Sequence, residues 1–129
     1  MATTGTAPAV AWPWPRTPAE VEREWLHVEL LATRMTALAA PGTSVADLGS
    51  NGRCLLGIRA AAMWSTERTA RLPISDREEP AGFWKAVDEI DAADRILFAH
   101  EPAWAYANGV ARWLSWLIDA EETVLYPPV

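Results

Sequence analysis

The chain has 129 residues, of which half are hydrophobic and 22% are charged, a composition typical of one globular domain that can form a core without disulfides or a bound metal. Its formal net charge of −6 argues against nucleic-acid and anionic-membrane partners, because both are recognised through basic patches. No apolar run approaches the roughly 20 residues that a membrane span needs, and the first residues lack the basic region of a secretory signal. Cys54 is the single cysteine and cannot form an intrachain disulfide, so we expect a cytoplasmic protein in which it is a small core or boundary residue.

Residues 1–16 are rich in Ala, Thr and Pro and end in Trp12-Pro13-Trp14-Pro15. Alternating prolines favour an extended polyproline conformation, from which the two indole rings project as apolar anchors. The sequence therefore predicts an extended Trp/Pro-rich tail that docks either on its own domain or on a partner chain. Residues 17–129 are predicted to form a single helical domain.

The first helix is predicted to begin with a capping box, in which Thr17 is the N-cap, Pro18 the first helical residue and Glu20 the third. Its end is expected at Pro41-Gly42. Glu24 falls within the apolar arc, in the second turn. The residues of that arc follow steps of four and three: Val21, Trp25, Val28, Ala32, Met35 and Ala39.

The second helical region covers residues 44–71, with a plausible cap at Ser44 and Asp47. Glycines at 49 and 52 leave open whether this region is one long helix or a short helix followed by a longer one. Arg59 points into the middle of the apolar arc, whereas Trp64 lies on the polar side. The arc itself comprises Leu55, Leu56, Ile58, Ala62 and Met63.

The third helix is predicted to begin either at a cap formed by Ser75 and Glu78 or with Pro80 as its first residue, to include residues 83–98 and to end near His100. Its apolar face is expected to comprise Phe83, Val87, Ile90, Leu97 and Phe98. Asp94 falls in the middle of that face, where a carboxylate is costly unless it finds a partner or stays protonated.

The fourth helix should run from Pro102 to about Glu122, and its apolar surface is so wide that it is either the most enclosed helix or one with a second partner. Four helices joined by short connections predict an all-α fold, an antiparallel four-helix bundle.

Three ionisable residues on inward faces are the candidates for chemistry: Asp94, Arg59 and Glu24. A guanidinium can bind a buried carboxylate through two parallel hydrogen bonds, so we expect Arg59 and Asp94 to form an ion pair. This pair either fixes helix register alone or lines a ligand pocket. In a pocket, Arg59 would hold an anionic or carbonyl group, and Asp94 or Glu24 would act as general acid or base.

The histidine and cysteine pattern contains no di-iron or zinc motif, and there is no Gly-rich phosphate loop or dinucleotide motif. We therefore predict no metal and no cofactor.

The eight tryptophans require two explanations. Some aromatic side chains fall on or beside apolar arcs, where they either pack in the core or contact a flat aromatic ligand. These candidate ligand-binding residues are Trp25, Trp84, Trp104, Tyr106 and Trp113. Trp64 and Trp116 project among polar residues, which indicates a homodimer or a protein partner, because tryptophan is enriched in interface hot spots.

The predicted first helix contains Leu-His-Val-Glu-Leu-Leu at residues 26–31 and Ala-Leu-Ala-Ala at residues 37–40. This stretch resembles the first helix of a group of small, uncharacterised actinobacterial proteins found near natural-product biosynthesis genes. The resemblance implies a role in specialised metabolism and carries over no catalytic residue.

The leading hypothesis is a small-molecule-binding protein, acting on an apolar or aromatic substrate as a cofactor-free cyclase or isomerase. The alternative is a non-catalytic adaptor or homodimer that uses exposed tryptophans.

Overall fold

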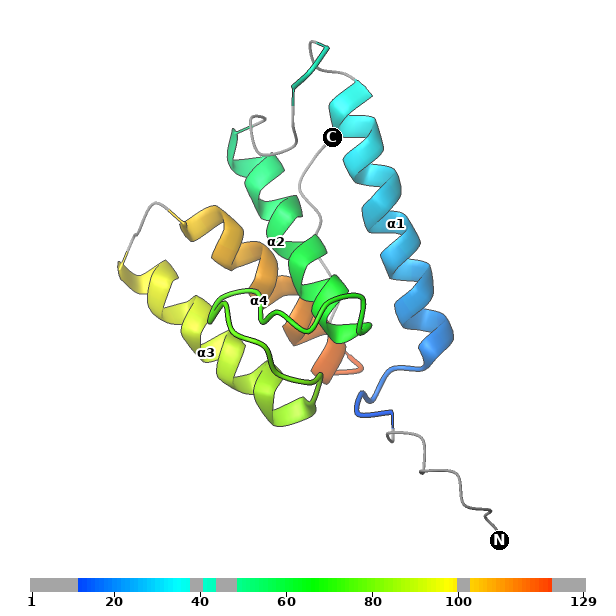
Figure 1. Cartoon of the computed structure of the whole chain (residues 1–129), viewed down its shortest axis with the longest axis vertical. Coiled ribbons are helices and arrows are strands. Elements are labelled where there is room, and N and C mark those ends of the chain that lie inside the picture. The colour runs from blue at the N-terminus through cyan, green and yellow to red at the C-terminus, as the bar shows by residue number, and fades with distance from the viewer. Residues whose placement is uncertain (1–11, 38–40, 44–48, 100–102, 122–129) are drawn as a thin grey trace, which may run out of the picture.

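The computed structural model describes residues 12–37, 41–43, 49–99 and 103–121, and this part of the chain is helical without a named strand. It contains the helices α1 (Pro18–Ala37), α2 (Gly49–Ser65), α3 (Phe83–Ala99) and α4 (Trp104–Ile118). The most extensive packing is between α2 and α4, while α3 packs on α4 and α1 packs on α2. Figure 1 shows the result: α2 and α4 form a central pair, with α1 on one side and α3 on the other. The prediction of an all-helical bundle is confirmed for the described residues.

The start of α1 is the predicted capping box. The Glu20 backbone N–H donates to Thr17 Oγ1 at 3.2 Å, and the Thr17 backbone N–H donates to Glu20 Oε1 at 3.1 Å. Because these bonds are local, they satisfy two helix-end donors whatever the rest of the chain does. They also lower the pKa of the Glu20 carboxyl below its ordinary value, the backbone bond from Thr17 being the main cause. The predicted end of this helix overlaps residues 38–40, which lie outside the described residues.

The second helix is continuous from Gly49 through Gly52 to Ser65 and does not extend to residue 71 as predicted. Glu67 has a φ of 61°, and the Arg68 backbone N–H donates to the Met63 carbonyl at 2.8 Å. A left-handed residue followed by such a bond is the Schellman ending of a helix, here with a glutamate in the place that glycine usually takes. The predicted cap at Ser44 and Asp47 lies outside the described residues.

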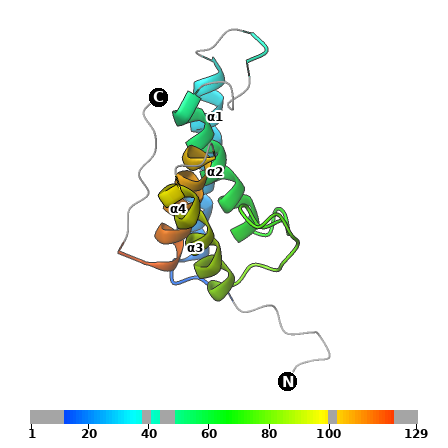
Figure 2. The same cartoon turned by 90° about the vertical axis from the view of Figure 1, so that its left-hand side faces the viewer.

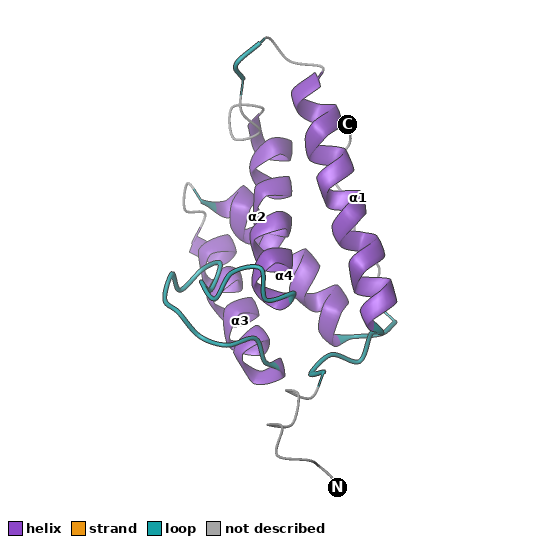
Figure 3. Ribbon diagram, turned by 45° about the vertical axis from the view of Figure 1, so that its right-hand side comes forward, coloured by secondary structure: helices purple, strands orange, loops and turns teal. Residues whose placement is uncertain are grey.

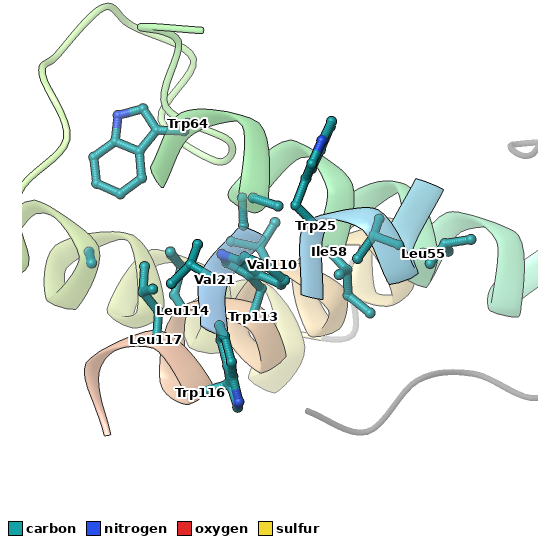
Figure 4. Close-up of a cluster of buried hydrophobic side chains, with 14 of the residues drawn as sticks. Val21, Trp25, Leu55, Ile58, Trp64, Val110, Trp113, Leu114, Trp116 and Leu117 are labelled. Atoms are coloured by element: carbon teal, nitrogen blue, oxygen red, sulfur yellow. The ribbon is translucent and has the colours of Figure 1, made fainter. Parts of the chain in front are cut away.

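Two glycines let the backbones of α2 and α4 touch. A Cβ atom on Gly57 would overlap the carbonyl oxygen of Tyr106, and a Cβ atom on Gly109 would overlap the carbonyl oxygen of Cys54. The two contacts are reciprocal, since each helix supplies one glycine and one carbonyl. The α2–α4 interface is therefore the closest part of the core, and its neighbouring side chains are fully buried: Leu55, Ile58, Val110 and Leu114. Figure 4 shows these side chains between the helices.

The segment 66–82 joins the end of α2 to the start of α3 as a loop, drawn in teal in Figure 3. Leu72 is fully buried and anchors it, while the Arg71 and Glu78 backbones pair as an isolated bridge. The loop covers Trp64, whose Nε1–H donates to the Glu79 carbonyl at 3.0 Å. The prediction that Trp64 projects among polar residues is therefore wrong, because loop residues cover the side of α2 that the helical pattern marks as polar.

Residues 12–16 form what we call the N-terminal clasp. Trp14 is buried against the Trp64 ring and donates from Nε1 to the Ser65 carbonyl at 3.1 Å. Arg16 is also buried; its Nε donates to the Trp116 carbonyl at 2.6 Å, and its guanidinium lies 4.2 Å from the Trp116 ring centre. This end of the predicted tail thus docks on its own chain; residues 1–11 lie outside the described residues.

The clasp also explains the burial of Trp116. A guanidinium donor is well placed at a helix C-terminus, where the last carbonyls have no partner within the helix. Arg16 supplies two such donors, the second to the Asp119 carbonyl at 2.9 Å. The prediction that Trp116 projects among polar residues is therefore wrong as well. Within the described chain, no helix is long and apolar enough to cross a membrane.

Candidate functional site

The third helix begins at Phe83, so the predicted starts at Ser75 and Pro80 are wrong. Its buried face also differs from the predicted one. Its buried residues are Ala86, Glu89 and Ala93, whereas Phe98 is 86% exposed. Two small residues on either side of Glu89 allow α3 to lie close to α4, and α3 has no second helix packed as extensively against it. The larger apolar side chains therefore lie beside the contact or in solvent, and the face predicted from the hydrophobic pattern is wrong in phase.

The predicted ion pair between Arg59 and Asp94 is also wrong. Arg59 Nε donates to Glu29 Oε1 of α1 at 2.7 Å, and its guanidinium lies 5.7 Å from the Trp25 ring centre. Asp94 is half-buried on α3, and no hydrogen bond or ion pair joins it to another described residue. The reason is the order of the helices, since α3 packs on α4 while Arg59 lies on the side of α2 that faces α1.

The third candidate, Glu24, lies 3.8 Å from His27 Nδ1 on the same helix. The three residues predicted to carry catalysis thus have separate surroundings: Arg59 contacts α1, Glu24 contacts its own helix, and Asp94 lies on α3. The described structure does not bring them together around one cavity.

The aromatic residues predicted to bind a ligand also lie in different surroundings. Trp113 is fully buried and donates from Nε1 to Ser65 Oγ at 2.9 Å. Trp25 is buried beneath the guanidinium of Arg68, 4.3 Å from its ring centre. Trp84 is 75% exposed and Trp104 is also exposed, so neither is a core residue.

A buried carboxylate does exist on α3, at Glu89, which is 1% exposed. Its Oε2 accepts hydrogen bonds from the backbone N–H groups of Ile74 at 2.7 Å and Ser75 at 3.1 Å, and its Oε1 accepts one from Ser75 Oγ. A carboxylate with three donors is well compensated for its burial. The signal that sequence reasoning missed is the pair of alanines three residues before and four residues after it.

Tyr106 is a predicted ligand-binding residue that does lie at a hollow. It lines a pocket of about 210 Å³ together with loop residues that include Arg71 and Asp76. Its hydroxyl donates to the Pro73 carbonyl at 2.9 Å. Burial raises the pKa of Tyr106, and the negative charges of Glu89 and Asp76 raise it further, so the hydroxyl remains a proton donor.

A larger hollow lies between α3 and α4. This groove has a volume of about 310 Å³, and its described lining consists of three apolar side chains, two carboxylates and a hydroxyl. The apolar residues are Val87, Ile90 and Ile118; the polar ones are Asp91, Ser115 and Asp119. In Figure 2 the side of the molecule that carries α3 faces the viewer.

The charges around this α3–α4 groove have one sign. Asp91 and Asp119 lie in the lining, and none of the described lining residues is basic. Ser115 and Ile118 belong to the last turn of α4 and Asp119 is its C-cap, where backbone carbonyls add partial negative charge. Arg16 donates to the Asp119 carbonyl at 2.9 Å, and the Asp119 carboxylate Oδ1 accepts the Glu121 backbone N–H at 3.0 Å.

Comparison with known protein families, characterised proteins and solved structures finds no match to this chain. The α3–α4 groove is larger than the Tyr106 pocket, and its two carboxylates are not tied up by a basic lining residue as Asp76 is by Arg71. We therefore take the α3–α4 groove as the candidate functional site.

Proposed function

We propose that this protein binds a small molecule in the α3–α4 groove, and that the ligand combines an apolar or aromatic body with a positive charge. The observation that carries the proposal is the lining: Val87, Ile90 and Ile118 form an apolar floor beside two carboxylates. Ligand sites are typically hollows of roughly 300–1,000 Å³ lined by apolar groups with a few convergent polar ones. The groove lies at the lower end of that range, which favours a ligand of one or two rings.

Charge supports a cation over a neutral or acidic ligand. Asp91 has no ion-pair partner among the described residues, and the end of α4 adds partial negative charge beside it. An ammonium or amidinium group on the ligand would supply the missing donors, while Ser115 offers a hydroxyl for a second polar group. The net charge of −6 also favours approach of a cation over approach of an anion.

We propose binding and assign no catalytic residue. The cyclase or isomerase hypothesis placed Arg59 in one pocket with Asp94 or Glu24, whereas Arg59 binds Glu29 and Glu24 lies 3.8 Å from His27. A cytoplasmic location and a role in specialised metabolism remain part of the proposal on the strength of the sequence alone. The same holds for an antiparallel order of the helices, which short connections favour.

The test uses three probes with one aromatic body and different charges: tryptamine, 3-ethylindole and indole-3-propionate. Titration calorimetry with the full chain should give the tightest binding for tryptamine and the weakest for indole-3-propionate. Asp91→Asn should weaken tryptamine binding by about tenfold and leave 3-ethylindole unchanged, because a charged hydrogen bond contributes on the order of 1.5–3 kcal/mol.

Glu78→Gln is the matched control, since it removes one negative charge from the exposed loop without touching the groove. It should bind tryptamine like the parent chain. Equal affinity for all three probes, or an Asp91→Asn variant that binds tryptamine normally, would refute the proposal.

A further inference from the structure

One side of α3 carries five exposed residues that lie outside the hydrophobic core, although the Trp84 ring lies edge-on to the Phe83 ring with ring centres 5.1 Å apart. They follow one another in steps of four and three, so they share one side of the helix: Trp84, Asp88, Asp91, Arg95 and Phe98. We call these five residues the α3 stripe. Large aromatic side chains occupy both of its ends, and charged side chains occupy the three positions between them.

The aromatic ends are the unusual feature. Trp84 is 75% exposed and Phe98 is 86% exposed, although both belong to residue types that normally bury most of their surface. A tryptophan that stays in solvent on a helix surface is a frequent anchor of a protein interface. The helix also lies at the edge of the molecule, with α4 as its main helical neighbour (Figure 1).

The charged residues indicate what covers the stripe. Asp88 and Arg95 form no ion pair with any described residue of the chain, so both are available to another molecule. Read from either end, the stripe has an aromatic residue first and last, with acidic residues toward one end and a basic residue toward the other. A second copy of the helix in reversed direction would place unlike charges opposite each other at both ends.

We infer that the α3 stripe is the interface of a two-fold symmetric homodimer in which α3 packs antiparallel to α3 of a second copy. Centred on Asp91, this pairing sets Trp84 opposite Phe98 of the partner subunit and Asp88 opposite Arg95 of the partner subunit. Two-fold symmetry repeats each contact, so two aromatic pairs and two ion pairs form at once. The stripe spans fourteen steps of helix, about 21 Å, which suits a short antiparallel helix pair.

The inference rests on observations other than those behind the proposed ligand site, although Asp91 takes part in both. At the two-fold axis Asp91 lies opposite its own copy, where two like charges oppose association. Asp91→Asn should therefore strengthen the dimer while it weakens tryptamine binding. Opposite effects of one substitution keep the two proposals separable, so failure of either leaves the other standing.

Sedimentation velocity of the full chain over a concentration series tests the dimer directly. The parent chain should dimerise, and Trp84→Ala should weaken the dimer by about tenfold or more, because hot-spot residues dominate interface energetics. Leu26→Ala on α1 is the matched control: Leu26 is 61% exposed but lies away from α3, so this variant should dimerise normally. A parent chain that stays monomeric at high micromolar concentration, or a dimer unaffected by Trp84→Ala, overturns the inference.

Charge reversal tests the antiparallel pairing. Asp88→Arg alone and Arg95→Asp alone should each be monomeric, since each places like charges opposite each other at both ends. Mixed together, the two variants should form a heterodimer, because residues 88 and 95 are then unlike in charge at both ends of the helix pair. Circular dichroism of each variant verifies that the helices are intact. A mixture of folded variants that does not associate would overturn the proposed register.

Discussion

The two faces of α4 differ in how closely another helix approaches them. Against α2, reciprocal glycine contacts at Gly57 and Gly109 bring backbone to backbone, and the side chains around them are fully buried. Against α3, the contact is made by alanines and by Glu89, and it leaves the groove of about 310 Å³ open beside it. One helix thus combines a closed interface with an open one.

This difference shows which of the two interfaces of α4 has space for a ligand. A site between α2 and its neighbours, as the sequence hypothesis placed it, would need space that the close backbone approach removes. The open interface instead offers a groove with two carboxylates and no basic residue in its described lining, and α3 also carries the exposed aromatic residues Trp84 and Phe98. The closed interface sets the fold, and the open one carries the candidate function.

The sharpest way to break the closed interface is to add one methyl group. Gly57→Ala and Gly109→Ala each force a Cβ atom into the backbone of the facing helix. Overpacking of this kind costs about 1–3 kcal/mol and sometimes more, and rigid backbone cannot rotate away, so we expect at least about 3 kcal/mol of lost unfolding free energy. Urea denaturation followed by circular dichroism measures it.

The control is Gly82→Ala, where an added Cβ atom would meet nothing within 4 Å. This variant should change the unfolding free energy by less than about 0.5 kcal/mol. If Gly57→Ala behaved like Gly82→Ala, the α2–α4 contact would not be the closed interface described above.

Beside the open interface, the buried carboxylate of Glu89 joins α3 to the loop of residues 66–82. Glu89→Ala leaves the Ile74 and Ser75 N–H groups without their acceptor, so we expect a loss of about 2–4 kcal/mol in unfolding free energy. Glu89→Gln keeps one acceptor oxygen and should lose about 1 kcal/mol.

Asp94→Asn is the control for the two Glu89 variants, because both carboxylates lie on α3. Asp94 makes no hydrogen bond with a described residue, so its variant should stay within about 0.5 kcal/mol of the parent chain. An Asp94→Asn variant that unfolds more easily than Glu89→Gln would reverse the assignment of the buried carboxylate.

The smallest effect concerns Cys54, which is buried in the closed interface. Burial raises the pKa of its thiol, so the folded state favours the protonated, unreactive form as pH rises through the ordinary thiol range. We expect labelling by an aromatic disulfide reagent at pH 8 to be far slower for the folded chain than for the chain in denaturant. Labelling at the rate of a free thiol would show that this interface opens readily.

Prediction from sequence worked where the physics is local. The capping box at Thr17 and Glu20 depends on residues three apart, and it was found where expected. It failed where a distant segment changes the surroundings of a helix face. Trp64 lies among polar neighbours in its own helix, but the clasp and the segment 66–82 cover it, and neither has helical periodicity that would reveal this.

The candidate site follows the same division. The sequence showed that a carboxylate on α3 would need partners, but the pattern selected Asp94, which lies among large apolar residues. Glu89 became the buried one because donors fifteen residues earlier in the chain reach it. The groove could not be predicted either, since its lining combines residues from two helices whose relative rotation the pattern does not specify.

The sequence by itself determined that this chain is helical, where α1 begins and that a proline- and tryptophan-rich segment precedes it, because periodicity, capping and proline geometry act over a few residues. Only the tertiary structure decided which helix faces meet, which carboxylate is buried and where a hollow remains. Those outcomes depend on how closely two backbones can approach and on hydrogen-bond donors supplied from elsewhere in the chain. A hydrophobic pattern does not reveal them, because it does not record which glycines and alanines allow a close approach or which loop N–H groups reach a helix.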